Sequence, residues 1–286
     1  MKHILLAIDR SAPSWEAARL AVHMAPRLSA RVSVLSIVVS GSRQSETRVL
    51  YNREYEAARE LVDDVVKDLA VAGVTAKGYV RTCSPGKAAE KILGYAANAE
   101  PDLIVMGSRA RGELTGLLLG SVSHEVAMGA ICPVVIVPAA TTTTISPRRI
   151  VLVVDGEGDL ERPVAVTAEL ARAVNAEVEV VCVDHTLGDG GEKGDMPAVN
   201  PDEAAVAAAA ATLMKDGLTV RWRMIDNLRG FAPEIAREVL ARGADMVVIG
   251  ARAIGLIGGD IAAGAAEAVV HRTRRPVVVA PARRRS

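Results

Sequence analysis

Two segments of the chain carry residues that could together bind an anionic ligand. Asp9 follows a short apolar run at the N-terminus, and residues 107–123 join a later apolar run to a helical pattern. A helix start binds anions through its free backbone N–H groups and its positive dipole end. Gly120 lets the backbone approach a ligand closely, and Ser121 and Ser123 add hydroxyl donors. These residue types predict an anion site that a carboxylate and a serine-bearing helix start share.

The same residues also fit a purely structural role. Ser121 could serve only as the helix cap, and the glycines could serve only to permit turns. The residues alone leave both interpretations open.

Other patterns of catalysis or binding are missing or incomplete. No GxGxxG follows the first apolar run, and no GxSxG or HExxH occurs. The segment 85–87 resembles the end of a phosphate-binding Walker loop, but Arg81 and Ala88 stand where that loop needs glycine and Ser/Thr, so we interpret it as a helix start. The five histidines are dispersed without metal-ligand spacing. We therefore expect no catalytic residues and no metal ligands.

Composition narrows the class of protein further. The 286 residues are 50% hydrophobic and 2% aromatic, with 34 Lys+Arg against 34 Asp+Glu, which gives no general attraction to nucleic acid or anionic membranes. The apolar run at the N-terminus is too short for a signal peptide, and no stretch approaches the ~20 apolar residues of a membrane span. Three scattered cysteines favour buried, reduced thiols. We expect a cytoplasmic protein without nucleic-acid or membrane partners.

The chain also repeats itself. Residues 102–138 and 245–281 align without a gap, and Asp, Gly and Pro recur 143 positions apart. Residues 4–11 and 150–157 also match, with aspartates 146 positions apart. This self-similarity predicts a tandem duplication. The expected domains are residues 1–138 and 148–286, joined by a linker over residues 139–147.

Short apolar runs alternate with helical patterns in both halves. The expected strands are 4–8, 31–39, 75–80, 103–106 and 134–137, then 150–154, 177–183, 218–224, 246–249 and 276–280. The expected helices are 13–28, 49–72, 86–99 and 121–130, then 160–174, 201–216, 230–242 and 260–272. Long surface loops are expected at 40–48 and 184–203. Continuous apolar strands of this kind predict an α/β fold with two doubly wound, five-stranded parallel sheets in the order 3-2-1-4-5. A ligand would then bind between strands 1 and 4 of a sheet, beyond their carboxyl ends.

The stretch MGSRARGELTGLLLGSVSHEVAMGAICPVVIVP, with AID after the first strand, resembles the universal stress protein family in its tandem form. The resemblance covers both halves of the chain. It implies an adenine nucleotide alpha hydrolase-like fold, repeats that pair along their fifth strands, and a possible homodimer. The ATP-binding branch of this family has the motif G-x2-G-x9-G-(S/T). Gly107, Gly120 and Ser121 match it, whereas Ala110 replaces its second glycine.

The resemblance implies that the first repeat binds ATP or ADP, with or without Mg²⁺. Asp9 would lie near adenine and ribose, Ile37 beside the adenine, and Gly120 and Ser121 at the phosphates, with weaker binding because of Ala110. The full set of nucleotide-binding residues implied in this way is Ala7, Ile8, Asp9, Ile37, Met106, Gly107, Arg109, Ala110, Gly120, Ser121, Val122 and Ser123.

The second repeat departs further from the motif. Ala251, Ala253 and Ala263 replace motif residues, and Asp260 adds negative charge to the corresponding loop. We expect this repeat to have a structural role. The expected function is that of a nucleotide-dependent regulator in stress rather than a fast enzyme. A slow ATPase and a nucleotide-free interaction module remain the alternatives.

Overall fold

The structure is a computed structural model that describes residues 1–40, 45–108, 121–138, 146–154, 160–184, 201–226, 231–250, 269 and 272–281. It divides into two compact units, one formed by the described residues up to 138 and one by those from 146 onwards. Most of the predicted linker lies outside the described residues.

The first unit contains a five-stranded parallel sheet. Its strands are β1 (His3–Ile8), β2 (Arg31–Val39), β3 (Ala76–Cys83), β4 (Leu103–Ser108) and β5 (Val134–Pro138). They lie in the order β3-β2-β1-β4-β5, which confirms the predicted order. β1 is central, and all six of its residues are buried. The carboxyl ends of β1 and β4 therefore lie side by side at the edge where the sequence predicts a ligand.

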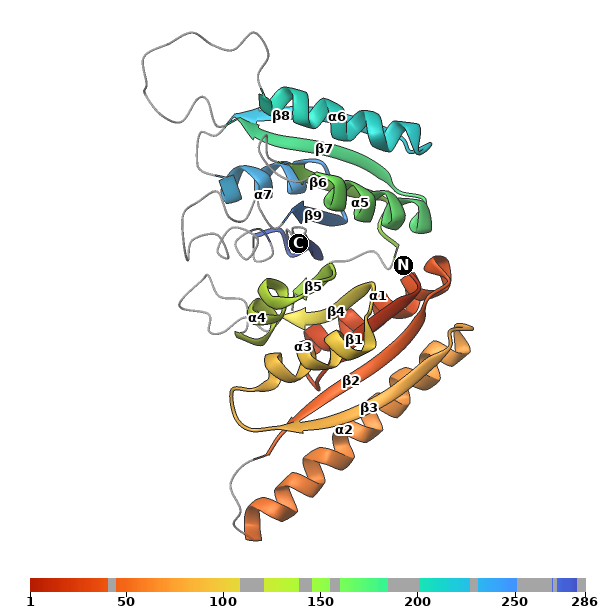
Figure 1. The fold of residues 1–286 in the computed structure, drawn as a ribbon, viewed down its shortest axis with the longest axis vertical. Coiled ribbons are helices and arrows are strands. Elements are labelled where there is room, and N and C mark those ends of the chain that lie inside the picture. The colour runs from red at the N-terminus through yellow and green to blue at the C-terminus, as the bar shows by residue number, and fades with distance from the viewer. Residues whose placement is uncertain are drawn as a thin grey trace. The chain divides into compact units, whose positions relative to one another are not determined.

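Helices cover both faces of this sheet. They are α1 (Ala12–Leu28), α2 (Ser45–Val71), α3 (Ala88–Ala99) and α4 (Ser121–Gly129). α1 contacts α2, and α3 contacts α4, so the helices form two pairs (Figure 1). The apolar strands between them supply a core of Ile, Leu and Val side chains with almost no exposed area.

The structure corrects two predicted boundaries in the first unit. Residues 45–48, predicted as part of a loop, belong to α2, because a serine followed by a glutamate favours a helix start. β3 extends to Cys83 rather than ending at residue 80. It is an edge strand with exposed polar residues, so its apolar run ends before its pairing with β2 does.

The second unit repeats the arrangement. Its strands are β6 (Arg149–Val154), β7 (Glu177–Asp184), β8 (Val220–Asp226), β9 (Met246–Gly250) and β10 (Val277–Ala280), in the parallel order β10-β9-β6-β7-β8. Its helices are α5 (Glu161–Val174), α6 (Pro201–Lys215) and α7 (Phe231–Ala241). The helix predicted near residues 260–272 and most of the loop predicted at 184–203 lie outside the described residues.

Both units hold the start of their central strand with one aspartate. Asp102 Oδ2 accepts hydrogen bonds from two successive backbone N–H groups before and within β1, and Asp245 Oδ2 does the same for β6. The donors are Lys2 and His3 in the first unit and Arg148 and Arg149 in the second. The duplication has therefore kept this contact in both repeats.

A cluster of neutral polar groups links β1, β2, β3 and α3 in the first unit. His3 Nε2 lies 2.9 Å from Ser33 Oγ, and His3 Nδ1 lies 3.1 Å from the carbonyl oxygen of Ala99. Arg31 Nη2 lies 3.3 Å from the same ring nitrogen, Nδ1. Tyr95 interacts with Ser33 and Tyr79, and its ring centroid lies 5.2 Å from that of Tyr79.

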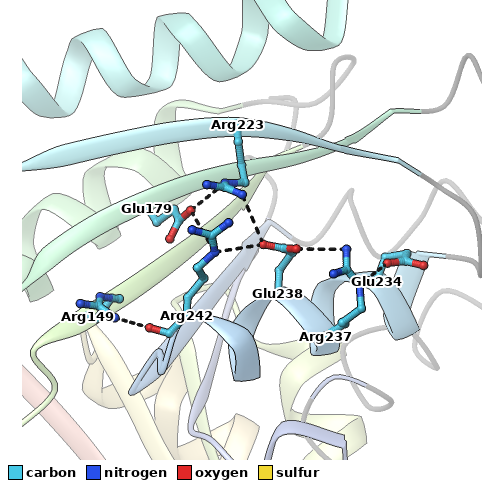
Figure 2. Close-up of polar contacts among 7 residues, drawn as sticks. All are labelled: Arg149, Glu179, Arg223, Glu234, Arg237, Glu238 and Arg242. Carbon is cyan, nitrogen blue, oxygen red and sulfur yellow. Dashed lines mark hydrogen bonds and ion pairs between the residues drawn. The ribbon is translucent and has the colours of Figure 1, made fainter.

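Ion pairs occupy the matching place in the second unit (Figure 2). Arg223 Nε lies 2.9 Å from Glu179 Oε1, and Arg242 Nε lies 3.3 Å from Glu238 Oε2. Both carboxylates are almost buried, with 9% and 8% of the side chain exposed. Arg149 donates to the backbone carbonyl of Arg242, as His3 contacts that of Ala99 in the first unit.

The match between the two clusters follows from the strand register. Ser33 lies thirty residues after His3, and Glu179 lies thirty after Arg149. Tyr95 lies seven residues before Asp102, and Glu238 lies seven residues before Asp245. Tyr79 and Arg223 occupy equivalent positions on β3 and β8. The neutral cluster His3–Ser33–Tyr79–Tyr95 thus corresponds to the charged cluster Arg149–Glu179–Arg223–Glu238.

Candidate functional site

A cavity of about 480 Å³ opens at the carboxyl ends of β1, β2 and β4 in the first unit. The starts of α3 and α4 complete its wall. Its lining residues are Ala7, Ile8, Asp9, Ser14, Leu35, Ile37, Val39, Gly86, Ala88, Ala89, Ile92, Met106, Gly107, Ser121, Val122, Ser123 and Glu125. Most of these side chains are apolar, and the polar ones come from the start of α1 and from α4.

The structure brings together most of the residues that the sequence singled out. Nine of the twelve line this cavity: Ala7, Ile8, Asp9, Ile37, Met106, Gly107, Ser121, Val122 and Ser123. The other three, Arg109, Ala110 and Gly120, lie outside the described residues.

Sequence reasoning missed the contribution of α3. Gly86, Ala88, Ala89 and Ile92 line the cavity, and Gly86 has a φ of +76°, a backbone conformation that favours glycine. The sequence predicts a helix that starts at residue 86, but Pro85 and Gly86 form a turn and α3 begins at Ala88. Only the position of this turn over the carboxyl edge of the sheet makes it part of the site.

Asp9 is held by hydroxyl groups at the start of α1. Its Oδ1 accepts hydrogen bonds from the backbone N–H and the hydroxyl of Ser11 and from Ser14 Oγ, which lies 2.7 Å away. The Asp9 N–H in turn donates to Ser14 Oγ over 3.0 Å. The carboxylate is therefore fixed in direction by Ser11, before α1, and by Ser14, in its first turn.

Gly107 is required by packing at this same turn. A Cβ at Gly107 would lie 2.5 Å from both the Pro13 carbonyl carbon and the Ser14 backbone nitrogen. The backbone of α1 thus passes directly over the end of β4. Gly107, which the family resemblance predicts as a nucleotide contact, is therefore also needed for the packing of α1 against β4.

The two serines of α4 differ in their surroundings. Ser123 is buried and its Oγ donates to Ser108 Oγ over 3.2 Å, which ties the start of α4 to the end of β4. Ser121 is exposed at the first position of the helix. Among the two hydroxyls predicted as ligand donors, Ser121 is thus the one presented to solvent.

The rim between α3 and α4 is charged. Lys87 Nζ lies 2.8 Å from Glu90 Oε2, and this hydrogen bond raises the pKa of Lys87 and lowers that of Glu90. Within the described part of the cavity lining, the charged residues are Asp9 and Glu125. The start of α4 therefore supplies the positive potential for an anion there.

Metal-ligand clusters and membrane-spanning helices are both absent from the described residues. No group of three or more His, Cys, Asp or Glu side chains there could hold a metal ion. None of the described helices combines the length and the apolar character that a membrane span requires.

Comparison with known proteins identifies relatives of both repeats. The model of the universal stress protein family matches residues 1–138 and 147–281. A universal stress protein of Bacillus subtilis is 34% identical over 148 residues, covering 47% of this chain and 97% of the relative. One of Mycobacterium tuberculosis is 26% identical over 234 residues, covering 79% of this chain and 77% of the relative.

A solved structure shows the same fold across both repeats. The universal stress protein from Archaeoglobus fulgidus DSM 4304 superposes with a TM-score of 0.74 at 19% identity, covering 98% of this chain and 96% of that one.

Proposed function

Because the chain belongs to the universal stress protein family, we propose that its first repeat binds ATP or ADP non-covalently and acts as a nucleotide-dependent regulator. One observation carries this proposal above the others. A single cavity joins an apolar floor, the Asp9 carboxylate and the start of α4. The motif residues Gly107 and Ser121 both line it.

The chemistry of the cavity suits the parts of an adenylate. Its volume falls within the range of roughly 300–1,000 Å³ that is usual for small-molecule sites. Ile8, Ile37 and Met106 offer an apolar surface for a base, and the carboxylate of Asp9 can accept hydrogen bonds from ribose hydroxyls. The first N–H groups of α4 and the exposed Ser121 hydroxyl would receive the phosphates. Mg²⁺, if it takes part, would enter with the phosphates.

In this proposal the bound nucleotide has a regulatory role. Nucleotide binding changes a conformational or partner equilibrium only when the two states bind the nucleotide with different affinity. We further propose that the second repeat is structural, that the two repeats pair along β5 and β10, and that the protein works in the cytoplasm. A homodimer of the whole chain belongs to the same proposal.

The test is a direct measurement of bound nucleotide. Protein purified without added nucleotide is heat-denatured, the released adenylate is quantified, and ATP and ADP are then titrated into nucleotide-free protein. Ala88→Phe should fill the cavity and weaken binding at least about tenfold, because the alanine lines the wall. Ala97→Phe is the matched control, since that alanine is exposed on the same helix and lies outside the lining.

The stoichiometry of bound nucleotide separates this proposal from the nucleotide-free interaction module. One equivalent per chain, lost in Ala88→Phe and kept in Ala97→Phe, supports the proposal. Two equivalents would contradict a structural role for the second repeat. Absence of binding at millimolar ATP and ADP would favour the nucleotide-free interaction module.

A further inference from the structure

A carboxylate lies on the face of α4 that we propose holds the phosphates. Glu125 follows Ser121 by four positions, a spacing that places two side chains on one helix face, one turn apart. Both residues line the cavity, and both are exposed. Glu125 therefore lies roughly 6 Å along the helix axis from the phosphate-binding start of α4.

The neighbouring cation is already engaged. Lys87, at the start of α3, has its pKa raised first by its hydrogen bond to Glu90 and more weakly by the charge of Glu125. The ammonium thus lies within the field of Glu125 but donates to another carboxylate. Within the described lining, Asp9 and Glu125 give the cavity a negative charge, and no lysine, arginine or histidine side chain from those residues offsets it.

We infer that Glu125 makes the site discriminate among adenine nucleotides by their net phosphate charge. This inference rests on the proposed function of the first repeat. Each further phosphate adds about one negative charge near the carboxylate, so Mg²⁺-free ATP is repelled more strongly than ADP, and ADP more strongly than AMP. Mg²⁺ bound to the phosphates offsets two of these charges, so the site favours AMP or Mg²⁺-complexed ATP over free ATP.

The size of the effect follows from Coulomb's law. For unit charges about 7 Å apart in a cavity open to water, the repulsion weakens binding by roughly three- to fivefold per added charge. Since ATP carries two more negative charges than AMP, Glu125→Gln should tighten Mg²⁺-free ATP about ten- to twentyfold more than AMP. Excess Mg²⁺ should reduce the gain for ATP to about that for AMP. Added salt should shrink every one of these differences.

The experiment is a set of calorimetric titrations of the full chain. AMP, ADP and ATP are titrated at low ionic strength, with EDTA or with excess Mg²⁺, into the wild type, Glu125→Gln and Glu60→Gln. Glu60 is exposed on α2 and does not line the cavity, so its variant changes the net charge equally without changing the site. Thermal unfolding verifies that both variants fold.

Each outcome bears on a different statement. A Kd ratio of ATP to AMP that falls in Glu125→Gln but not in Glu60→Gln supports the inference. An unchanged ratio in Glu125→Gln, or the same fall in both variants, overturns it and leaves nucleotide binding intact. If the wild type binds none of the three nucleotides, the proposed function fails and the inference fails with it.

Discussion

Replacing Gly107 with alanine should destabilise the first unit through a single methyl group. That methyl would lie 2.5 Å from two backbone atoms of α1, at Pro13 and Ser14, where ordinary van der Waals contact begins near 3.4 Å. Backbone atoms cannot rotate away as a side chain can. The start of α1 must therefore move relative to β4, and such overpacking costs about 2 kcal/mol.

The loss should be measurable by two independent assays. For a unit of this size, about 2 kcal/mol corresponds to roughly 5–10 °C in Tm. Because Ser14 donates to Asp9 Oδ1, the same displacement should disturb the carboxylate and weaken nucleotide binding. Urea denaturation gives the free energy of unfolding, and calorimetric titration gives the Kd.

Two other glycines provide controls of opposite and smaller effect. Gly94→Ala in α3 has no atom within 4 Å of the new Cβ and should stabilise the helix by about 1 kcal/mol. In the second unit, a Cβ at Gly250 would lie 3.1 Å from the Pro163 ring, a side-chain contact that can relax, so Gly250→Ala should cost less than Gly107→Ala. A Gly107→Ala protein as stable as the wild type would refute this packing argument.

Three further predictions concern the polar contacts. Burial, and then the Arg31 guanidinium, hold the pKa of His3 below its ordinary value of 6.5, so protonation favours the unfolded chain. The free energy of unfolding should therefore fall as the pH drops below about 6.5. Denaturation series between pH 7.5 and 5 should show a smaller fall for His3→Gln than for the wild type. An equal fall in both proteins would contradict this prediction. Asp102→Ala and Asp245→Ala should each lower the free energy of unfolding by about 1–2 kcal/mol in urea denaturation, because each leaves two backbone N–H groups without their acceptor. An unchanged stability in both variants would show that water replaces the carboxylate as acceptor. Glu238→Gln should lower the free energy of unfolding by about 3 kcal/mol, because Arg223 and Arg242 lose a buried carboxylate partner. Tyr95→Phe, at the matching position of the first unit, should lower it by about 1 kcal/mol. Equal losses in the two variants would argue against the charged network.

The fold was accessible from the sequence because its signals are local and occur twice. The run Arg31–Val39 was predicted with both of its ends, since it is apolar, β-branched and flanked by turns. Errors arose where tertiary position overrides local pattern. β3 continues beyond its apolar residues because it pairs with β2 as far as Cys83. The first residues of α2 are polar and charged, a composition that is also typical of loops.

The candidate site was accessible only in part, for a related reason. Asp9 and Ser121 belong to turns that the strand order places together, so spacing alone could locate them. Ala88 and Ile92 carry no chemical signal and join the cavity only because α3 packs beside α4. Likewise, the steric demand at Gly107 depends on where the backbone of α1 passes, which no local pattern records.

The contrast between the neutral and charged clusters should also matter while the duplicated chain folds. Two similar repeats on one polypeptide can exchange equivalent helices, a known route to misassembly. If α7 docked on the first sheet, Glu238 would face Ser33 and Tyr79 and lose Arg223, its guanidinium partner on the sheet. If α3 docked on the second, Tyr95 would leave Glu179 and Arg223 without a third charged partner. We therefore expect each sheet to favour its own helix, so that the divergence of these few residues disfavours an exchange of helices between the two repeats.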